Sequence, residues 1–180
     1  ADETIAAIEI LLENGAEKLI FDVRNNPGGY AHELVDVLDY LLPEGELFRA
    51  VSYDGEENVD YSDADCLEMP MAVLVNGSSY SAAEFFAAAM QDYGAGYVVG
   101  QQTSGKGYFQ TTIHLNDGSA VALSVGKYYT PGGTSLANVG VTPDRWIETD
   151  EETEAGIYYG TLSPMEDPYI REAVTLLKNK

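Results

Sequence analysis

Cysteine, basic residues and long apolar runs are all scarce in this 180-residue sequence. Its only cysteine, Cys66, excludes an internal disulfide, a redox pair and a cysteine-based zinc site. We interpret that residue as a small buried apolar side chain. Apolar runs are a few residues long, so the sequence predicts no membrane span, and its first residues lack the pattern of a signal peptide.

Basic residues are few compared with acidic ones. Thirty acidic residues face nine lysines and arginines, which gives a formal charge of -21. Nucleic acid and anionic membranes demand basic patches, so neither is expected as a partner. A hydrophobic content of 45% instead predicts one globular domain spanning residues 1–180. Because the sequence begins at Ala1 without methionine, we expect it to be part of a longer protein.

Apolar periodicity predicts alternating helices and strands in the first half of the chain. A helix around residues 5–12 ends at Gly15, and a buried strand follows at 18–24. After the turn Asn-Asn-Pro-Gly-Gly, helical spacing resumes from His32 to Leu42, and Pro43 stops it. The sequence thus predicts a first strand–helix unit.

A second strand–helix unit is expected further along. Predicted here are strands at 47–53, 71–76 and 96–100, an acidic surface loop at 54–65, and helices at 81–93 and 168–179. Alternation from Tyr108 to Leu115 and an Asn-Asp-Gly-Ser turn predict a β-hairpin. The expected fold class is α/β, with a mostly parallel sheet and an attached hairpin.

The stretch GQQTSGKG, residues 100–107, is close to a phosphate-binding loop. That motif requires a serine or threonine after the lysine and a helix behind it. Here Gly107 follows Lys106, and a hairpin comes next, so a nucleotide site is not expected. Lys106 is also the only formally charged residue between Tyr93 and Asn116. It is either an ordinary surface lysine on a turn or a desolvated amine that serves as a general base.

Serines that could pair with such a base occur in NGSSYSAAE, where the strand at 71–76 turns into a helix. Ser81 and Glu84 have the spacing of a helix capping box, and Ser81 could equally be a nucleophile. A Ser-His-Asp catalyst is the rival arrangement, with His32 or His114 as base. No Gly-x-Ser-x-Gly elbow supports that rival, and both histidines also suit ordinary packed or surface positions.

Four long segments together resemble the C-terminal processing peptidases, or tail-specific proteases. The matching segments are KLIFDVRNNPGG, VLVNGSSYSAAEFFAAAMQDYGAGYVVGQQTSGKGYFQT, SVGKYYTPGGTSLANVGVTPD and EDPYIREAVTLLK. Members of that family are serine peptidases with a Ser/Lys dyad on a crotonase-like α/β core. The resemblance therefore implies a crotonase-like fold and a peptidase that needs no metal or organic cofactor.

Individual roles follow from the same resemblance. It implies that Ser81 is the nucleophile, Lys106 the base and Gln110 the residue that orients the lysine. Backbone amides of Gly28, Gly29 and Ala82 would bind the oxyanion, which suits glycine because a carbonyl can approach it closely. Asp92 also matches a family position. It lies about 16 Å along the helix from Ser81 at ~1.5 Å per residue, so we expect it to be structural.

Substrate and context are implied in the same way. The expected substrate is a protein or peptide cut near its C-terminus, in an extracytoplasmic compartment of a bacterium. The family carries an upstream PDZ domain that this chain lacks, so we expect the domain in the full-length protein, and a homo-oligomer is possible. The alternative is a non-catalytic ligand- or peptide-binding module on the same scaffold, because a fold does not fix activity.

Overall fold

The computed structural model describes residues 1–178, and the predicted helix end at Asn179 lies outside them. Its elements are, in chain order, α1 (Asp2–Glu13), β1 (Leu19–Asp22), α2 (Ala31–Leu41), β2 (Gly45–Ser52), β3 (Glu57–Ser62), β4 (Met71–Val75), α3 (Ala82–Asp92), β5 (Gly96–Gly100), β6 (Tyr108–His114), β7 (Ala120–Tyr129), β8 (Arg145–Trp146), α4 (Glu151–Tyr158) and α5 (Pro168–Lys178). The α/β class is confirmed.

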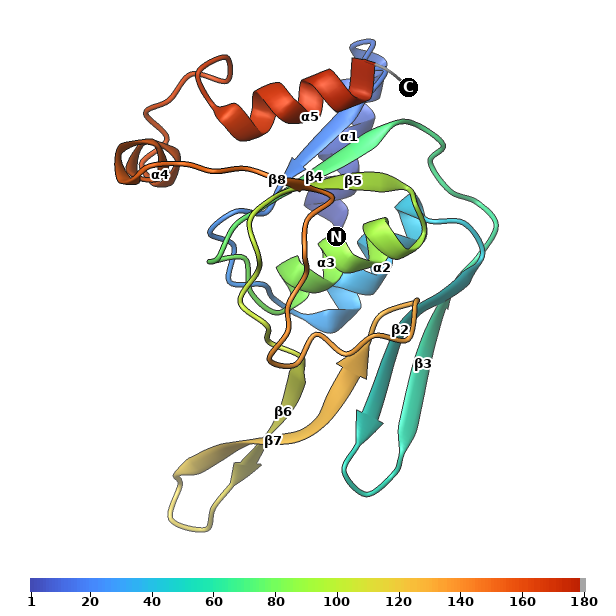
Figure 1. Cartoon of the computed structure of the whole chain (residues 1–180). Coiled ribbons are helices and arrows are strands. Elements are labelled where there is room, and N and C mark those ends of the chain that lie inside the picture. Colours follow the sequence, from blue (N-terminus) through green and yellow to red (C-terminus); the bar gives the residue numbers. More distant parts are fainter. Residues whose placement is uncertain (179–180) are drawn as a thin grey trace.

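Strands β1, β4, β5 and β8 form a parallel sheet in the order β1-β4-β5-β8, called sheet A below. Successive side chains of a strand point to opposite faces. Along β4, Val73 therefore packs with α2 and α3, whereas Leu74 packs with Tyr169 and Ala173 of α5. Helices α3 and α5 accordingly lie on opposite faces of sheet A (Figure 1).

The other four strands form a separate antiparallel sheet, sheet B, in the order β3-β2-β7-β6. The sequence predicted one mostly parallel sheet with a hairpin, but here two sheets of equal strand number share the chain. Strand β2 causes the difference because it pairs with β7, about 75 positions later, and local patterns do not reveal such pairing. The β6–β7 hairpin projects from the body of the molecule (Figure 1).

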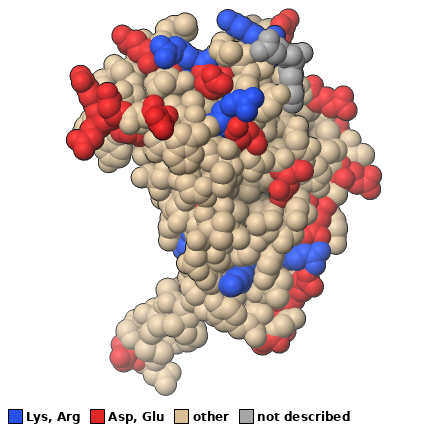
Figure 2. All heavy atoms as spheres, viewed as in Figure 1, with Lys and Arg blue, Asp and Glu red and all other residues tan. Residues whose placement is uncertain are grey.

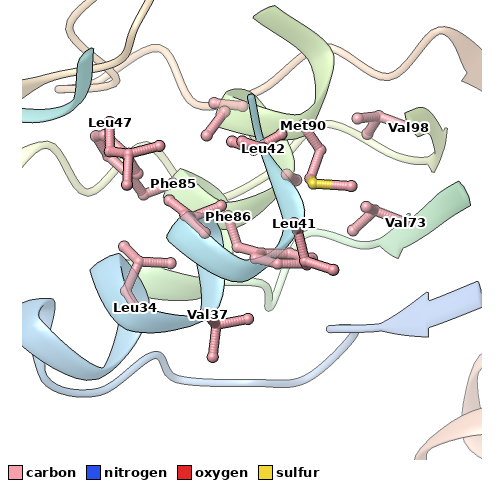
Figure 3. Close-up of a cluster of buried hydrophobic side chains, with 14 of the residues drawn as sticks. Leu34, Val37, Leu41, Leu42, Leu47, Val73, Phe85, Phe86, Met90 and Val98 are labelled. Carbon is pink, nitrogen blue, oxygen red and sulfur yellow. The ribbon is translucent and has the colours of Figure 1, made fainter. Parts of the chain in front are cut away.

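The main core lies between α2, α3 and the two sheets (Figure 3). Phe85 on α3 contacts Phe48 of β2 and Tyr128 of β7, with ring centroids 4.9 and 5.5 Å apart. Aromatic pairs at such distances contribute beyond their buried area. These contacts join helix α3, which packs on sheet A, to sheet B.

Besides the two-residue strand β8, two elements were missed from the sequence. Strand β3 lies in the stretch assigned to an acidic loop, where the charged residues sit on an exposed sheet edge instead. Helix α4 begins at Asp150, whose side chain accepts a hydrogen bond from the Thr153 amide, but its sequence has little apolar periodicity. Both elements are polar and largely exposed, so a search for buried faces overlooks them.

Charge is unevenly distributed over the surface. Acidic side chains spread over the upper and right-hand parts of the face in Figure 2, whereas the projecting hairpin shows one acid near its tip. Between Tyr108 and Gly126 the only formally charged residue is Asp117. None of the helices in residues 1–178 combines the length and apolar character of a membrane span.

Candidate active site

The turn between β4 and α3 carries three serines in three environments. Ser79 is buried, and its hydroxyl donates to the carbonyl of Val23 at 2.8 Å and accepts from the amide of Asn76 at 3.0 Å. Ser78 is exposed, and Ser81 is half-buried at the start of α3. Ser79 thus holds the turn together, while Ser81 lies beside a pocket.

Ser81 has an unusual backbone conformation, with φ 58° and ψ -120°. A positive φ is costly for any residue with a Cβ, and such strain concentrates at functional sites. Gly28 makes the conformation possible from the opposite loop: a Cβ there would lie 2.6 Å from the carbonyl oxygen of Tyr80 and 2.7 Å from the amide of Ala82. The sequence predicted a strand-to-helix bend at this point, but not the positive φ of Ser81.

Glu84 is the residue whose role the sequence understated. The predicted capping box is present, with the Ser81 amide donating to Glu84 Oε2 at 2.9 Å. The same fully buried carboxylate also accepts hydrogen bonds from Thr103 Oγ1 at 2.5 Å, Gly105 N at 2.6 Å and Lys106 N at 3.0 Å. One side chain therefore joins the Ser81 turn to the Lys106 loop, and its position as an acid among the apolar residues at the start of α3 was the available signal.

The resemblance of residues 100–107 to a phosphate-binding loop now has a structural explanation. Its amides at Gly105 and Lys106 do point at an anion, but that anion is the Glu84 carboxylate. The glycines serve close packing, since a Cβ at Gly107 would lie 2.2 Å from the amide of Ala137. These two amides are thus already engaged inside the protein.

Lys106 is half-buried on that loop. Its Nζ donates to Gln110 Oε1 at 3.2 Å and lies 5.0 Å from the centre of the Tyr80 ring. Among residues 1–178, no ion pair of Lys106 and no hydrogen bond between its Nζ and Ser81 is found. Catalytic hydrogen bonds are often long until substrate binds, so the arrangement is compatible with a dyad.

Gln110 lies on β6, on the side of that strand that faces Lys106. Its Oε1 accepts from the lysine, while its Nε2 donates to the carbonyl of Tyr108 at 3.3 Å and to Ser124 Oγ at 3.2 Å. These two donations fix the orientation of the amide, so that its oxygen faces the ammonium. The predicted pairing of Lys106 with Gln110 is therefore present in the structure.

Amides near Ser81 include the three that the resemblance implied. The Gly28 amide donates to Asn26 Oδ1 at 2.8 Å and is therefore occupied in this conformation. Within the described chain, no hydrogen bond partner is found for the amides of Gly29 and Ala82. Gly29 and Ala82 thus offer donors that an incoming oxygen could use, and Gly28 would do so only after release from Asn26.

A small pocket of about 130 Å³ opens beside Ser81. Its walls are mostly apolar and include Leu34, Phe48, Phe85 and Phe109. A larger pocket of about 240 Å³, which includes Gly28 and Gly29, shares Leu34 and Ala82 with it. The serine therefore lies at the edge of a hollow suited to an uncharged side chain.

The remaining candidates lie away from this hollow. Asp92 accepts a hydrogen bond from the Gly132 amide at 2.8 Å and so fixes the turn after β7, which agrees with the expected structural role. His32 is exposed beside Tyr30, and His114 ends the exposed strand β6, so the structure brings neither to Ser81. Residues 1–178 contain no group of three or more His, Cys, Asp or Glu that could hold a metal ion.

Tyr128, which the sequence did not single out, completes the site. Its hydroxyl donates to the carbonyl of Lys106, and its ring lines the pocket beside Ser81. Burial raises the pKa of the Tyr128 hydroxyl well above its usual range, against a smaller opposing effect of a hydrogen bond with the Ser81 side chain. No local pattern distinguishes this tyrosine from the many others in the chain.

Comparison with known proteins gives the family. The model of peptidase family S41 matches residues 1–147. The carboxyl-terminal-processing protease of Synechocystis is 36% identical over 147 residues, covering 81% of this chain and 34% of that protein. The carboxy-terminal-processing protease of Bartonella bacilliformis is 39% identical over 135 residues, covering 72% of this chain and 30% of that protein.

A solved structure agrees with these sequence matches. The photosystem II D1 C-terminal processing protease superposes with a TM-score of 0.73 at 35% identity, covering 79% of this chain and 38% of that one. The chain thus spans about a third of the length of the curated relatives it matches. On the family match over residues 1–147 and these relatives, the chain belongs to peptidase family S41, together with the carboxyl-terminal-processing proteases.

Proposed function

We propose that this chain is the catalytic core of a serine endopeptidase that uses Ser81 as nucleophile and Lys106 as base. The observation that carries the proposal is the Glu84 carboxylate, which binds the amides of both residues. A nucleophile and a base far apart in the chain are thereby held on one buried anchor.

The reaction follows from ordinary acyl-transfer chemistry. Ser81 Oγ attacks the peptide carbonyl while the Lys106 side chain accepts its proton, and free amides at Gly29 and Ala82 stabilise the oxyanion. Lys106 then donates that proton to the departing amine, which leaves an acyl group on Ser81. Water attacks this ester, its proton passes to Lys106 and then to Ser81, and the carboxylic product is released. Gln110 keeps the lysine side chain oriented throughout.

The substrate we propose is a protein or peptide cut near its C-terminus, because proteins similar to this chain are named for such processing. The apolar walls beside Ser81 favour an uncharged side chain next to the cleaved bond. We further propose a crotonase-like classification, one domain over residues 1–180, an upstream PDZ domain in the full-length protein, an extracytoplasmic bacterial location and a possible homo-oligomer. Each of these rests on the family resemblance.

A non-catalytic binding module is the alternative. An exposed or salt-bridged lysine in a wide apolar groove would favour it. Lys106 is instead half-buried, its Nζ contacts Gln110 and Tyr80, and the adjoining pocket is small. These features favour the peptidase.

The decisive experiment is labelling with a fluorophosphonate, a probe that reacts with activated serines. The wild-type chain, Ser81→Ala, Lys106→Ala and the control Ser78→Ala, whose serine is exposed in the same turn, are treated alike, and the adduct is located by peptide mass. An adduct on Ser81 that both dyad substitutions abolish and Ser78→Ala retains supports the proposal. An unlabelled but folded wild-type chain, tested also in the full-length protein, contradicts it.

A further inference from the structure

Tyr128, on β7 of sheet B, binds the loop that carries Lys106 and lines the pocket beside Ser81. Its hydroxyl donates to the carbonyl of Lys106, and its amide donates to the carbonyl of Gly107 at 3.2 Å. The Lys106 loop is therefore held at two successive carbonyls by one residue of β7. Glu84 binds the same loop through its amides, so the loop is fixed from both sides.

The ring of Tyr128 has little freedom to move. It is buried, and its centroid lies 5.7 Å from that of Phe48 and 5.5 Å from that of Phe85. Two neighbouring aromatic rings leave a tyrosine few rotamers, so the position of its hydroxyl is well defined. The ring lines the same small pocket as Ser81.

The chemistry of the group limits what it can do. A buried phenol resists losing its proton, so at neutral pH the hydroxyl remains a hydrogen-bond donor and acceptor and does not compete with Lys106 as a base. Its single proton is directed at the Lys106 carbonyl, so the hydroxyl acts on the Lys106 loop and takes no part in the proton transfer itself.

We propose that Tyr128 is a positioning residue for the dyad: its hydroxyl fixes the loop that carries Lys106, and with it the position of the base relative to Ser81. This inference rests on the proposed function of Ser81 and Lys106. An aromatic core residue alone would not require the hydroxyl group, and this difference makes the proposal testable.

The test compares Tyr128→Phe with Tyr93→Phe. Tyr93 is a matched control because its partly buried hydroxyl also donates to a backbone carbonyl, that of Glu46, at 2.9 Å, outside the site. Each variant is reacted with the fluorophosphonate at several concentrations, which separates the maximal inactivation rate from the apparent probe affinity. Thermal unfolding and hydrogen exchange at the amides of Gly105 and Lys106 are measured in parallel.

We expect Tyr128→Phe to lower the maximal rate of Ser81 labelling about 10- to 100-fold with little change in probe affinity. Exchange at Gly105 and Lys106 should become faster, while Tyr93→Phe matches the wild type in both readouts. Equal labelling rates for the two variants would overturn the positioning role, and so would a rate loss in Tyr128→Phe that merely follows its thermal unfolding. If the wild-type chain does not label at all, the proposed function itself has failed, and this inference fails with it.

Discussion

The backbone amide of Lys106 donates to the buried carboxylate of Glu84 at 3.0 Å, although 22 positions separate the two residues in the chain. Helix α3 and the loop after β5 are therefore joined by a charge-assisted hydrogen bond, which is stronger than one between neutral groups. Because the same carboxylate binds the amide of Ser81, the geometry of the site depends on this one side chain.

Replacing Glu84 with glutamine should damage both stability and chemistry. The amide keeps the shape of the side chain but presents an NH₂ group to at least one of its four donors, which leaves buried groups unpaired. We expect a loss of about 2–4 kcal/mol in the free energy of unfolding and at least a tenfold slower labelling of Ser81. Urea unfolding and the fluorophosphonate assay measure the two effects. Glu9→Gln, an exposed change on α1, should alter neither.

Gly28 and Gly29 offer a second test, because they differ in the space available for a side chain. A Cβ at Gly28 would meet Tyr80 and Ala82, and its φ of +83° already disfavours a side chain, whereas nothing lies within 4 Å of a Cβ at Gly29. Gly28→Ala should cost more than about 2 kcal/mol of stability and abolish labelling. Gly29→Ala should cost less than about 1 kcal/mol. Equal stability of the two variants would contradict this account.

Substitutions of Ser79 and Ser81 should distinguish a structural serine from the proposed nucleophile. Removing the Ser79 hydroxyl leaves the amide of Asn76 without its acceptor and the carbonyl of Val23 with only the longer bond from the Asn26 amide, at 3.4 Å. We expect Ser79→Ala to lower the free energy of unfolding by about 1–3 kcal/mol while Ser81 still reacts with the probe. Ser81→Ala should show the reverse pattern, with labelling abolished and stability changed little. Loss of labelling in well-folded Ser79→Ala would contradict the assignment.

Alkaline pH should destabilise the fold through Tyr128 and Tyr169. Burial raises the pKa of both phenols in the folded state, above the value of about 10 expected when unfolded. The stabilisation is fully present below pH ~10, and it is lost as pH rises because the unfolded state then releases protons that the folded state retains. Urea unfolding between pH 8 and 11 should show this decline, and Tyr128→Phe should make it shallower. If the free energy of unfolding of Tyr128→Phe declined with pH as steeply as that of the wild type, Tyr128 would not be one of the groups responsible.

Local patterns predicted the elements that have one buried face. The spacing of Leu34, Val37, Leu38 and Leu41 predicts α2, and all four side chains are buried. The acidic stretch containing β3 carries no such signal, because an exposed edge strand is held by pairing with β2 and not by burial. The pairing of β2 with β7 was missed for another reason, because the two strands are distant in the chain.

In the site, likewise, the sequence predicted individual residues but not the contacts between distant segments. Ser81, Lys106 and Gln110 could be named from the sequence through the family resemblance, and the structure brings Lys106 and Gln110 into contact. The hydrogen bonds that Glu84 and Tyr128 make with the Lys106 loop could not be predicted, because each of them joins segments that are distant in the chain. The positive φ of Ser81 is likewise imposed by its surroundings, since serine has no intrinsic preference for it.

Because the strands form two separate sheets, the proposed reaction depends on how precisely the two sheets are held against each other. Ser81 belongs to the layer built on sheet A, whereas Lys106 lies on the segment that leaves this layer for sheet B. The distance between the Ser81 and Lys106 side chains therefore depends on the packing between the two layers, where Phe48 contacts Phe85. A substitution at that contact can shift one layer against the other by a fraction of an ångström, and the protein would then remain folded while its nucleophile and base fall out of alignment.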